Sequence, residues 1–166
     1  RRAVSTYLGS GGRIMEHKKT RELEQMICDC TGAKHAHMVP SATMGLLLCS
    51  MLSEIKPGEE FDVSAYTQAA TANGAILMGA TPNIIDVDKN TYTIDFDKVI
   101  NRVVFVSSIN GRAPADYEQK ITQLRESGHF VIEDAAQAFG SHTVQGNHIG
   151  TLGDVGVFSF GAPKII

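Results

Sequence analysis

The sequence predicts an α/β fold in which a mostly parallel β-sheet is sandwiched between helices. Short apolar stretches rich in Val and Phe, such as Val103–Ser107, alternate along the chain with segments of helical periodicity, such as Asp116–Ser127. A strand buried on both faces reads as a continuous apolar run, and a parallel sheet covered by helices consists of such strands. The composition, 43% hydrophobic and 20% charged over 166 residues, is that of a globular domain with its own core.

The first third of the chain is expected to contain a helix, a short strand and a second, buried helix. Over Glu16–Cys30, apolar residues recur among charged ones at helical spacing, and Gly32 supplies a helix stop. A short strand is predicted at Lys34–Val39. The apolar stretch Met44–Leu52 predicts a buried helix, because it has no polar face along its length.

The rest of the chain repeats this order of strand and helix. Further strands are predicted at Glu60–Val63, Thr81–Val87, Val103–Ser107, His129–Glu133 and Val155–Phe160. Further helices are predicted at Thr67–Met78 and Asp116–Ser127. No repeat and no low-complexity linker divides the chain, so residues 1–166 are expected to form one domain.

Charge and cysteine content exclude several classes of partner. The formal net charge of −3 arises from acidic and basic residues spread along the chain, so no basic stripe is available for nucleic acid. The longest apolar run is far shorter than a bilayer requires, so no membrane partner is expected. The three cysteines lack the spacing of a disulfide framework, which favours reduced thiols and a cytoplasmic location. His35 and His37 lack a third ligand at useful spacing, so no metal site is expected.

Ligands of open parallel sheets bind beyond the carboxyl ends of the strands, and the first candidate site there is Ser41–Gly45. These small and hydroxylic residues stand between a predicted strand and the buried helix. Free N–H groups at a helix start form an anion site, to which Thr43 can add a hydroxyl. A plain cap of the helix by Ser41 or Thr43 explains the same residues.

The second candidate is Val131–Gln137, in which Glu133 and Asp134 end an apolar strand. A carboxylate in a partly dry crevice needs a cationic or N–H partner to remain charged, and a protonated pyridine nitrogen is one such partner. The alternative is a helix-capping Asp134 with Glu133 in a surface ion pair.

The third candidate is Lys164, which follows the last predicted strand and a Gly/Pro turn. A lysine whose pKa is lowered by burial is a nucleophile that forms a Schiff base with an aldehyde. The alternative is an ordinary solvated lysine, the usual state of this residue type.

Taken together, these segments resemble the DegT/StrS family of pyridoxal-phosphate (PLP)-dependent sugar aminotransferases, which have the aspartate-aminotransferase fold. The resemblance runs from about Tyr7 to the end of the chain. The segments that carry it are Ser41-Ala42-Thr43, Ala65-Tyr66-Thr67, Thr71-Ala72-Asn73, Met78–Pro82, Ile132–Gln137, Gly150–Asp154, Phe158-Ser159-Phe160 and Lys164.

The resemblance implies a role for several residues. Lys164 matches the Schiff-base lysine of the family, which also shuttles a proton during the reaction. Asp134 matches the acid that pairs with the pyridine nitrogen and keeps the ring an electron sink. Gln137 matches the residue that faces the ring hydroxyl.

The remaining implied contacts hold the cofactor's phosphate and ring. Ser159, and Thr43 with the backbone of Met44, match the family's phosphate cradle. Gln68 stands where relatives often carry an aromatic residue that stacks on the ring.

The implied function is transfer of an amino group from glutamate to a keto group of a nucleotide-linked deoxysugar, in polysaccharide or antibiotic sugar biosynthesis. Family members are more than twice as long, so residues 1–166 are expected to be a truncated chain: the N-terminal part of the PLP-binding large domain, without the small C-terminal domain. Such a chain would need a homodimer partner or a complementing C-terminal segment. The alternatives are a non-catalytic PLP-binding or interaction fragment and a PLP-dependent sugar dehydratase; the related dehydratases have His in place of the lysine, so Lys164 favours transamination.

Overall fold

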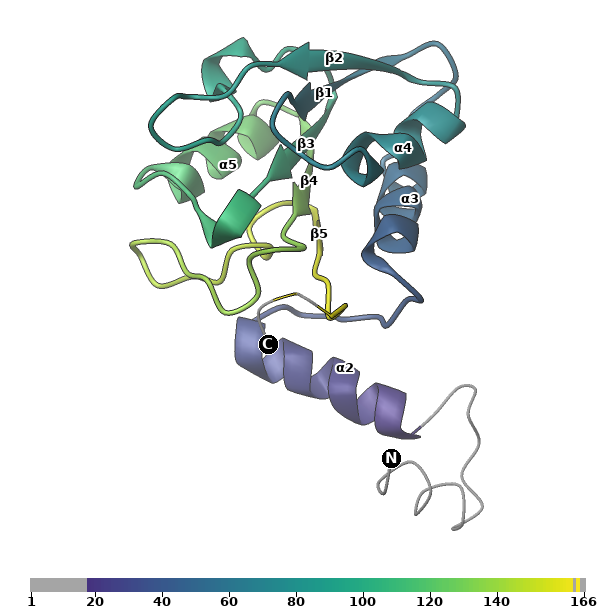
Figure 1. The fold of residues 1–166 in the computed structure, drawn as a ribbon, viewed down its shortest axis with the longest axis vertical. Coiled ribbons are helices and arrows are strands. Elements are labelled where there is room, and N and C mark those ends of the chain that lie inside the picture. The colour runs from purple at the N-terminus through teal and green to yellow at the C-terminus, as the bar shows by residue number, and fades with distance from the viewer. Residues whose placement is uncertain (1–17, 163, 165–166) are drawn as a thin grey trace. The chain divides into compact units, whose positions relative to one another are not determined.

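The structure is a computed structural model that describes residues 18–162 and 164 (Figure 1). The chain divides into two compact units, one formed by Arg1–Met38 and the other by Val39–Ile166. We describe each unit in turn.

The described part of the first unit is helix α2 (Lys18–Thr31) and the extended segment after it. The expected helix over Glu16–Cys30 is confirmed from Lys18 onward; Glu16 and His17 lie outside the described residues. The strand predicted at Lys34–Val39 is wrong, because these residues pair with no strand of the described sheet. The Met38 N–H instead donates to Glu24 Oε1 at 2.9 Å. An extended segment without a ladder partner is not a strand.

The second unit contains a five-stranded sheet. Its strands are β1 (Glu60–Ser64), β2 (Thr81–Ile85), β3 (Val103–Ser107), β4 (Phe130–Asp134) and β5 (Val155–Val157). Their spatial order is β2-β1-β3-β4-β5, and every neighbouring pair is parallel. The carboxyl ends of all five strands therefore lie along one edge of the sheet.

Helices cover both faces of this sheet, which confirms the predicted α/β sandwich. They are α3 (Ala42–Leu52), α4 (Ala70–Leu77) and α5 (Tyr117–Glu126), with short 3₁₀ turns at Phe96–Lys98 and Ile109–Gly111. Figure 1 shows α3 and α4 on one side of the strands and α5 on the other.

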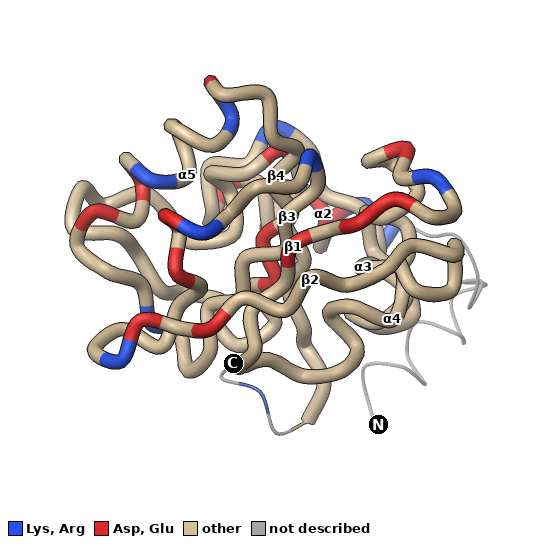
Figure 2. The backbone as a smooth tube through the Cα atoms, turned by 90° about the horizontal axis from the view of Figure 1, so that it is seen from above, with Lys and Arg blue, Asp and Glu red and all other residues tan. Residues whose placement is uncertain are grey.

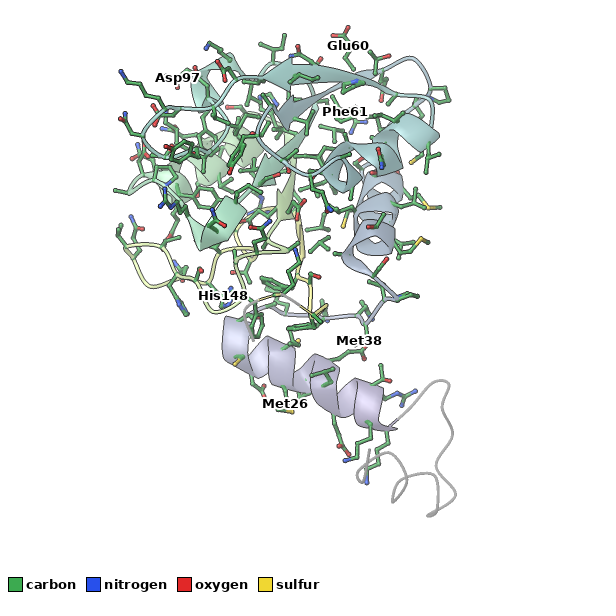
Figure 3. All side chains as sticks on the ribbon, viewed as in Figure 1. Met26, Met38, Glu60, Phe61, Asp97 and His148 are labelled. Atoms are coloured by element: carbon green, nitrogen blue, oxygen red, sulfur yellow. The ribbon has the colours of Figure 1, made fainter. Side chains whose placement is uncertain are left out.

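Two apolar cores result from the alternation of side chains along the strands. Phe105 of β3 packs with Leu46 of α3 in one core, whereas its neighbour Val104 packs with Ile121 of α5 in the other. Figure 3 shows Phe61 of β1 on the α4 side, where its ring lies edge-on to Phe105 at 5.4 Å between centroids. β3 is thus buried on both faces, as its continuous apolar run predicts.

Several predicted elements end earlier or start later in the structure, and the register explains two of these differences. β2 stops at Ile85 rather than Val87 because its partner β1 ends at Ser64, which is paired with Ile85. β5 stops at Val157 rather than Phe160 because β4 ends at its partner Asp134. The predicted helix over Thr67–Met78 starts at Ala70, after a turn.

Charged residues of both signs are interspersed along the backbone (Figure 2). The ion pairs recorded among the described residues involve exposed side chains, as in Lys120 Nζ to Asp97 Oδ1 at 2.7 Å. Such pairs contribute little to stability. Within residues 18–162 and 164, no helix combines the length and apolar character needed to cross a bilayer.

Candidate active site

A pocket opens at the carboxyl ends of β1, β3 and β4. It contains about 250 Å³ of space between atoms, part of it open to solvent. Its lining residues are Thr67, Gln68, Ser108, Ile109, Asp134, Ala136, Gln137 and Lys164. Four residues singled out from the sequence, Gln68, Asp134, Gln137 and Lys164, therefore lie around one pocket at the edge of the sheet where a ligand was expected.

Asp134 is the last residue of β4, and its half-buried carboxylate is held on both oxygens. Oδ2 accepts from Thr71 Oγ1 at 2.6 Å, and Oδ1 accepts from the Ala136 N–H at 3.1 Å. No Lys, Arg or His among the described residues forms an ion pair with it. Each oxygen keeps a further lone pair for a donor in the pocket. The helix-cap reading is wrong, because a turn rather than a helix follows Asp134.

The buried Cys49 thiol also feels the charge of Asp134. The Cys49 thiol of α3 is buried, and this burial, with a smaller contribution from the negative charge of Asp134, raises its pKa to about 11. The Asp134 carboxylate is thus close enough to a dry region for its charge to be felt there.

Glu133 has a different environment from its neighbour Asp134. Its side chain is fully buried and accepts from the Tyr117 hydroxyl and from the backbone N–H groups of Gly150, Leu152 and Gly153, at 2.7–3.0 Å. Burial raises its pKa, and the four donors oppose that rise. The alternative in which Glu133 forms a surface ion pair is therefore wrong, and the residue fixes the loop before β5.

Gln137 is oriented by the loop after β3. The Asn110 N–H donates to Gln137 Oε1 at 3.0 Å. Because a backbone N–H can only donate, this bond identifies the oxygen of the amide and leaves the Gln137 NH₂ group as the end available to a ligand. Asn110 adopts a left-handed conformation with φ +55°, which brings its N–H toward Gln137.

Lys164 reaches the pocket from a turn after β5. Its backbone N–H donates to Gly161 O at 2.8 Å. Its side chain is half-buried and forms no ion pair with a carboxylate of the described residues. The amine is therefore available to a ligand in the pocket.

The expected phosphate contacts, Thr43, Met44 and Ser159, are not among the residues that line this pocket. A Cβ at Gly45 would be 3.1 Å from Val157 Cγ1, so the first turn of α3 packs on the end of β5, two residues before Ser159. The Met44 N–H donates to Ser41 Oγ at 3.2 Å, which makes Ser41 rather than Thr43 the cap. The N–H of Thr43, within the first turn, has no acceptor inside the helix.

Sequence reasoning missed three hydroxyl residues that stand behind Asp134, namely Thr67, Thr71 and Ser107. Ser107 and Thr67 could have been found, because they end or follow strands at the ligand-binding edge. Thr71 could not, because it lies in a helix and nothing local indicates its partner.

A sequence profile of the DegT/DnrJ/EryC1/StrS aminotransferase family matches residues 1–166. The chain belongs to this family. Among solved structures, an aminotransferase from Psychrobacter cryohalolentis matches with a TM-score of 0.89 at 27% identity, over 99% of this chain and 43% of that protein. Spr1654 from Streptococcus pneumoniae, assigned as a sugar aminotransferase, matches in its PMP form with a TM-score of 0.86 at 27% identity, over 97% and 45%.

A DegT/DnrJ/EryC1/StrS aminotransferase from Brucella abortus matches with a TM-score of 0.84 at 27% identity, over 98% of this chain and 46% of that protein. The chain therefore spans 43–46% of the length of these three relatives. An Escherichia coli GDP-4-keto-6-deoxy-D-mannose-3-dehydratase with hydrated PLP shares the fold at 22% identity, with a TM-score of 0.83.

The cofactor of this DegT/DnrJ/EryC1/StrS family is PLP, as the PLP and PMP forms of the relatives show. The described residues fit such a group. Asp134 has acceptor capacity and no cation, which suits a protonated ring nitrogen, and Gln137 offers an NH₂ donor to a ring oxygen. Lys164 lines the same pocket.

Proposed function

We propose that the chain carries the cofactor half-site of a PLP-dependent aminotransferase that moves an amino group from glutamate to a keto group of a nucleotide-linked deoxysugar. The reaction would serve polysaccharide or antibiotic sugar biosynthesis in the cytoplasm. The observation that carries the proposal is the meeting of Lys164, Asp134 and Gln137 around one pocket at the carboxyl edge of the sheet. Family membership makes this the chemistry to test first.

The cofactor, when bound, supplies an electron sink for the bond broken at the donor's alpha carbon. Lys164 would hold it covalently and, once released, move a proton from that alpha carbon. Asp134 would accept a hydrogen bond from the ring nitrogen and keep it protonated. Gln137 would donate its NH₂ to the ring oxygen.

The phosphate would lie between the start of α3 and the end of β5. Thr43 offers a hydroxyl and an N–H without a helical acceptor, and Ser159 offers a hydroxyl from the neighbouring segment. The Met44 N–H would have to share its hydrogen with Ser41 Oγ. Gln68 lines the pocket, and its flat amide would lie against the ring in place of an aromatic side chain.

The substrate side of the site would be completed by further protein. We propose a homodimer, or a segment C-terminal to these residues, as the source of the missing contacts. The keto-sugar and its nucleotide would bind there, opposite the cofactor.

A labelling experiment tests the attachment point. The protein is loaded with PLP, reduced with borohydride and digested, and the modified peptide is identified by mass spectrometry. The pyridoxyl group is expected on Lys164, because the other candidate contacts converge on it. A label on Lys120 or another lysine would remove the basis of the proposal.

A substitution at Asp134 tests the chemistry. Asp134→Asn keeps the side chain's shape but removes its charge, so PLP should still bind while half-transamination with glutamate slows about 100-fold, or about 3 kcal/mol. An unchanged rate would mean that Asp134 only caps the turn at Ala136. Analysis of the sugar product tests the dehydratase alternative. A dehydratase would remove a hydroxyl from the sugar, whereas an aminotransferase would add an amine.

A further inference from the structure

Behind Asp134, three hydroxyl side chains form a connected row. Thr71 Oγ1 donates to Asp134 Oδ2 at 2.6 Å, Thr67 Oγ1 is 2.7 Å from Thr71 Oγ1, and Ser107 Oγ is 2.7 Å from Thr67 Oγ1. Thr71 is fully buried and Ser107 is 1% exposed. Both ends of the row are therefore shielded from solvent, while its middle member, Thr67, is partly buried and also lines the pocket.

Counting protons gives this row a direction. An ionised Asp134 can only accept, so the single hydroxyl proton of Thr71 must go to it. Thr71 Oγ1 must then accept from Thr67, whose own proton is used in that bond. Thr67 in turn accepts from Ser107, so all three hydroxyls donate toward the carboxylate. Hydrogen bonds aligned in this way strengthen one another where water is excluded.

The fold fixes the members of the row from different elements. Ser107 ends β3 and is in register with Asp134 at the end of β4, while Thr67 follows β1. Thr71 lies in the first turn of α4. That helix is held close to α3 at Gly74, where a Cβ would be 2.8 Å from the Leu47 backbone.

We propose that Thr71, supported by Thr67 and Ser107, is the positioning residue that holds the Asp134 carboxylate oriented toward the cofactor's ring nitrogen. The inference rests on the proposed function, because it explains how the protein's own hydrogen bonds to Asp134 leave that carboxylate free to bind the cofactor. With Thr71 on Oδ2 and the Ala136 N–H on Oδ1, the carboxylate cannot rotate without breaking a bond. The remaining lone pairs are thereby presented to the pocket.

The test replaces the hydroxyl and leaves the shape. Thr71→Val removes the donor to Asp134, and Thr71→Ser keeps it. Each protein is loaded with PLP labelled with ¹⁵N at the ring, and the ¹⁵N chemical shift is followed with pH. In Thr71→Val the carboxylate is free to turn away from the ring, so the ring nitrogen should lose its proton at lower pH than in the wild type, and Thr71→Ser should restore the wild-type titration. A structural role alone would not move this signal.

The half-reaction with glutamate provides a second readout. Loss of one hydrogen bond to a charged group should slow the limiting rate of Thr71→Val by about 10-fold or more. The glutamate concentration for half-maximal rate should change little, because Thr71 does not line the pocket. Thr93→Val is the matched control: Thr93 is also buried, and among residues 18–162 and 164 its hydroxyl bonds only to Thr91. It should leave both readouts unchanged.

The outcomes separate this inference from the proposed function. If wild-type protein takes up no PLP, the proposed function fails. If it takes up PLP and Thr71→Val has the wild-type ring-nitrogen titration and rate, the inference about Thr71 is overturned. Should Thr71→Val not fold, Ser107→Ala decides, because it removes only the far end of the row. It is expected to shift the titration in the same direction by less, and no shift would overturn the inference.

Discussion

The buried carboxylate of Asp62 should stabilise the connection that leads into β3. Asp62 lies in β1 with no exposed surface, and its Oδ2 accepts from the N–H groups of Ile100 and Asn101, both at 2.7 Å. Its Oδ1 accepts from the side-chain amides of Asn83 and Asn101, also at 2.7 Å. One side chain therefore satisfies two backbone donors of a segment that has no strand or helix of its own.

Replacing Asp62 by Ala leaves the N–H groups of Ile100 and Asn101 without an acceptor. At about 1–3 kcal/mol for each donor left unpaired, Asp62→Ala should lower the free energy of unfolding by about 2–6 kcal/mol. Asp62→Asn should cost less, about 1–2 kcal/mol, because its one oxygen can still accept from both N–H groups while the neighbouring amides rotate.

Urea unfolding at neutral pH measures this series. With a slope of about 1–3 kcal/mol per M, the midpoint of Asp62→Ala should fall by about 1 M or more at unchanged slope. Hydrogen exchange at the Ile100 and Asn101 amides should accelerate in the same variant. Asp97→Ala is the control, because that side chain is 83% exposed and its ion pair with Lys120 contributes little. Wild-type stability in Asp62→Ala would refute the reasoning.

Two further predictions concern reactivity and close packing. Because burial raises the pKa of Cys49 to about 11, its thiol should resist alkylation at pH 8, whereas the exposed thiol of Cys30 should react. The free energy of unfolding should fall as the pH rises from 9 toward 11, because in that range the folded protein keeps the Cys49 proton and the unfolded chain loses it. Mass spectrometry after iodoacetamide treatment checks the first point, and equal labelling of both thiols would contradict it. Gly156→Ala should destabilise the protein by about 3 kcal/mol or more, since its Cβ would overlap Gly150 O. A thermal unfolding midpoint equal to that of the wild type would show that the loop before β5 moves aside easily.

The pattern of apolar residues along the sequence predicted strands well where both faces of the strand are buried. Val103–Ser107 is found at its predicted bounds, because both of its faces are apolar and it lies in the middle of the sheet. Lys34–Val39 failed for the opposite reason. A strand exists only with a partner, and the presence of a partner is a non-local fact that no window of sequence contains.

The candidate site was predicted in part by the same kind of argument. The rule that ligands bind beyond the carboxyl ends of parallel strands pointed to Asp134 and Lys164, and both line the pocket. The same rule could not predict where the helix after β1 starts. In the structure a turn precedes Ala70, and Thr71 in the first turn of the helix donates to the Asp134 carboxylate. That placement depends on how α4 packs on α3, which the helical pattern does not encode.

The two adjacent acids show most directly why chemistry cannot be read from residue type alone. Successive residues of a strand face opposite sides of the sheet. Glu133 accordingly meets Tyr117 of α5, and Asp134 meets Thr71 of α4. All four recorded donors to Glu133 come from the protein itself, so the side chain has no access to a ligand and acts as a fixed acceptor for the loop. Asp134 has one protein donor on each oxygen and faces a pocket, so part of its capacity is left for something outside the chain. The alternation of the strand thus gives two adjacent carboxylates different surroundings: Glu133 is closed in by protein donors, and Asp134 lines a pocket with acceptor capacity left over.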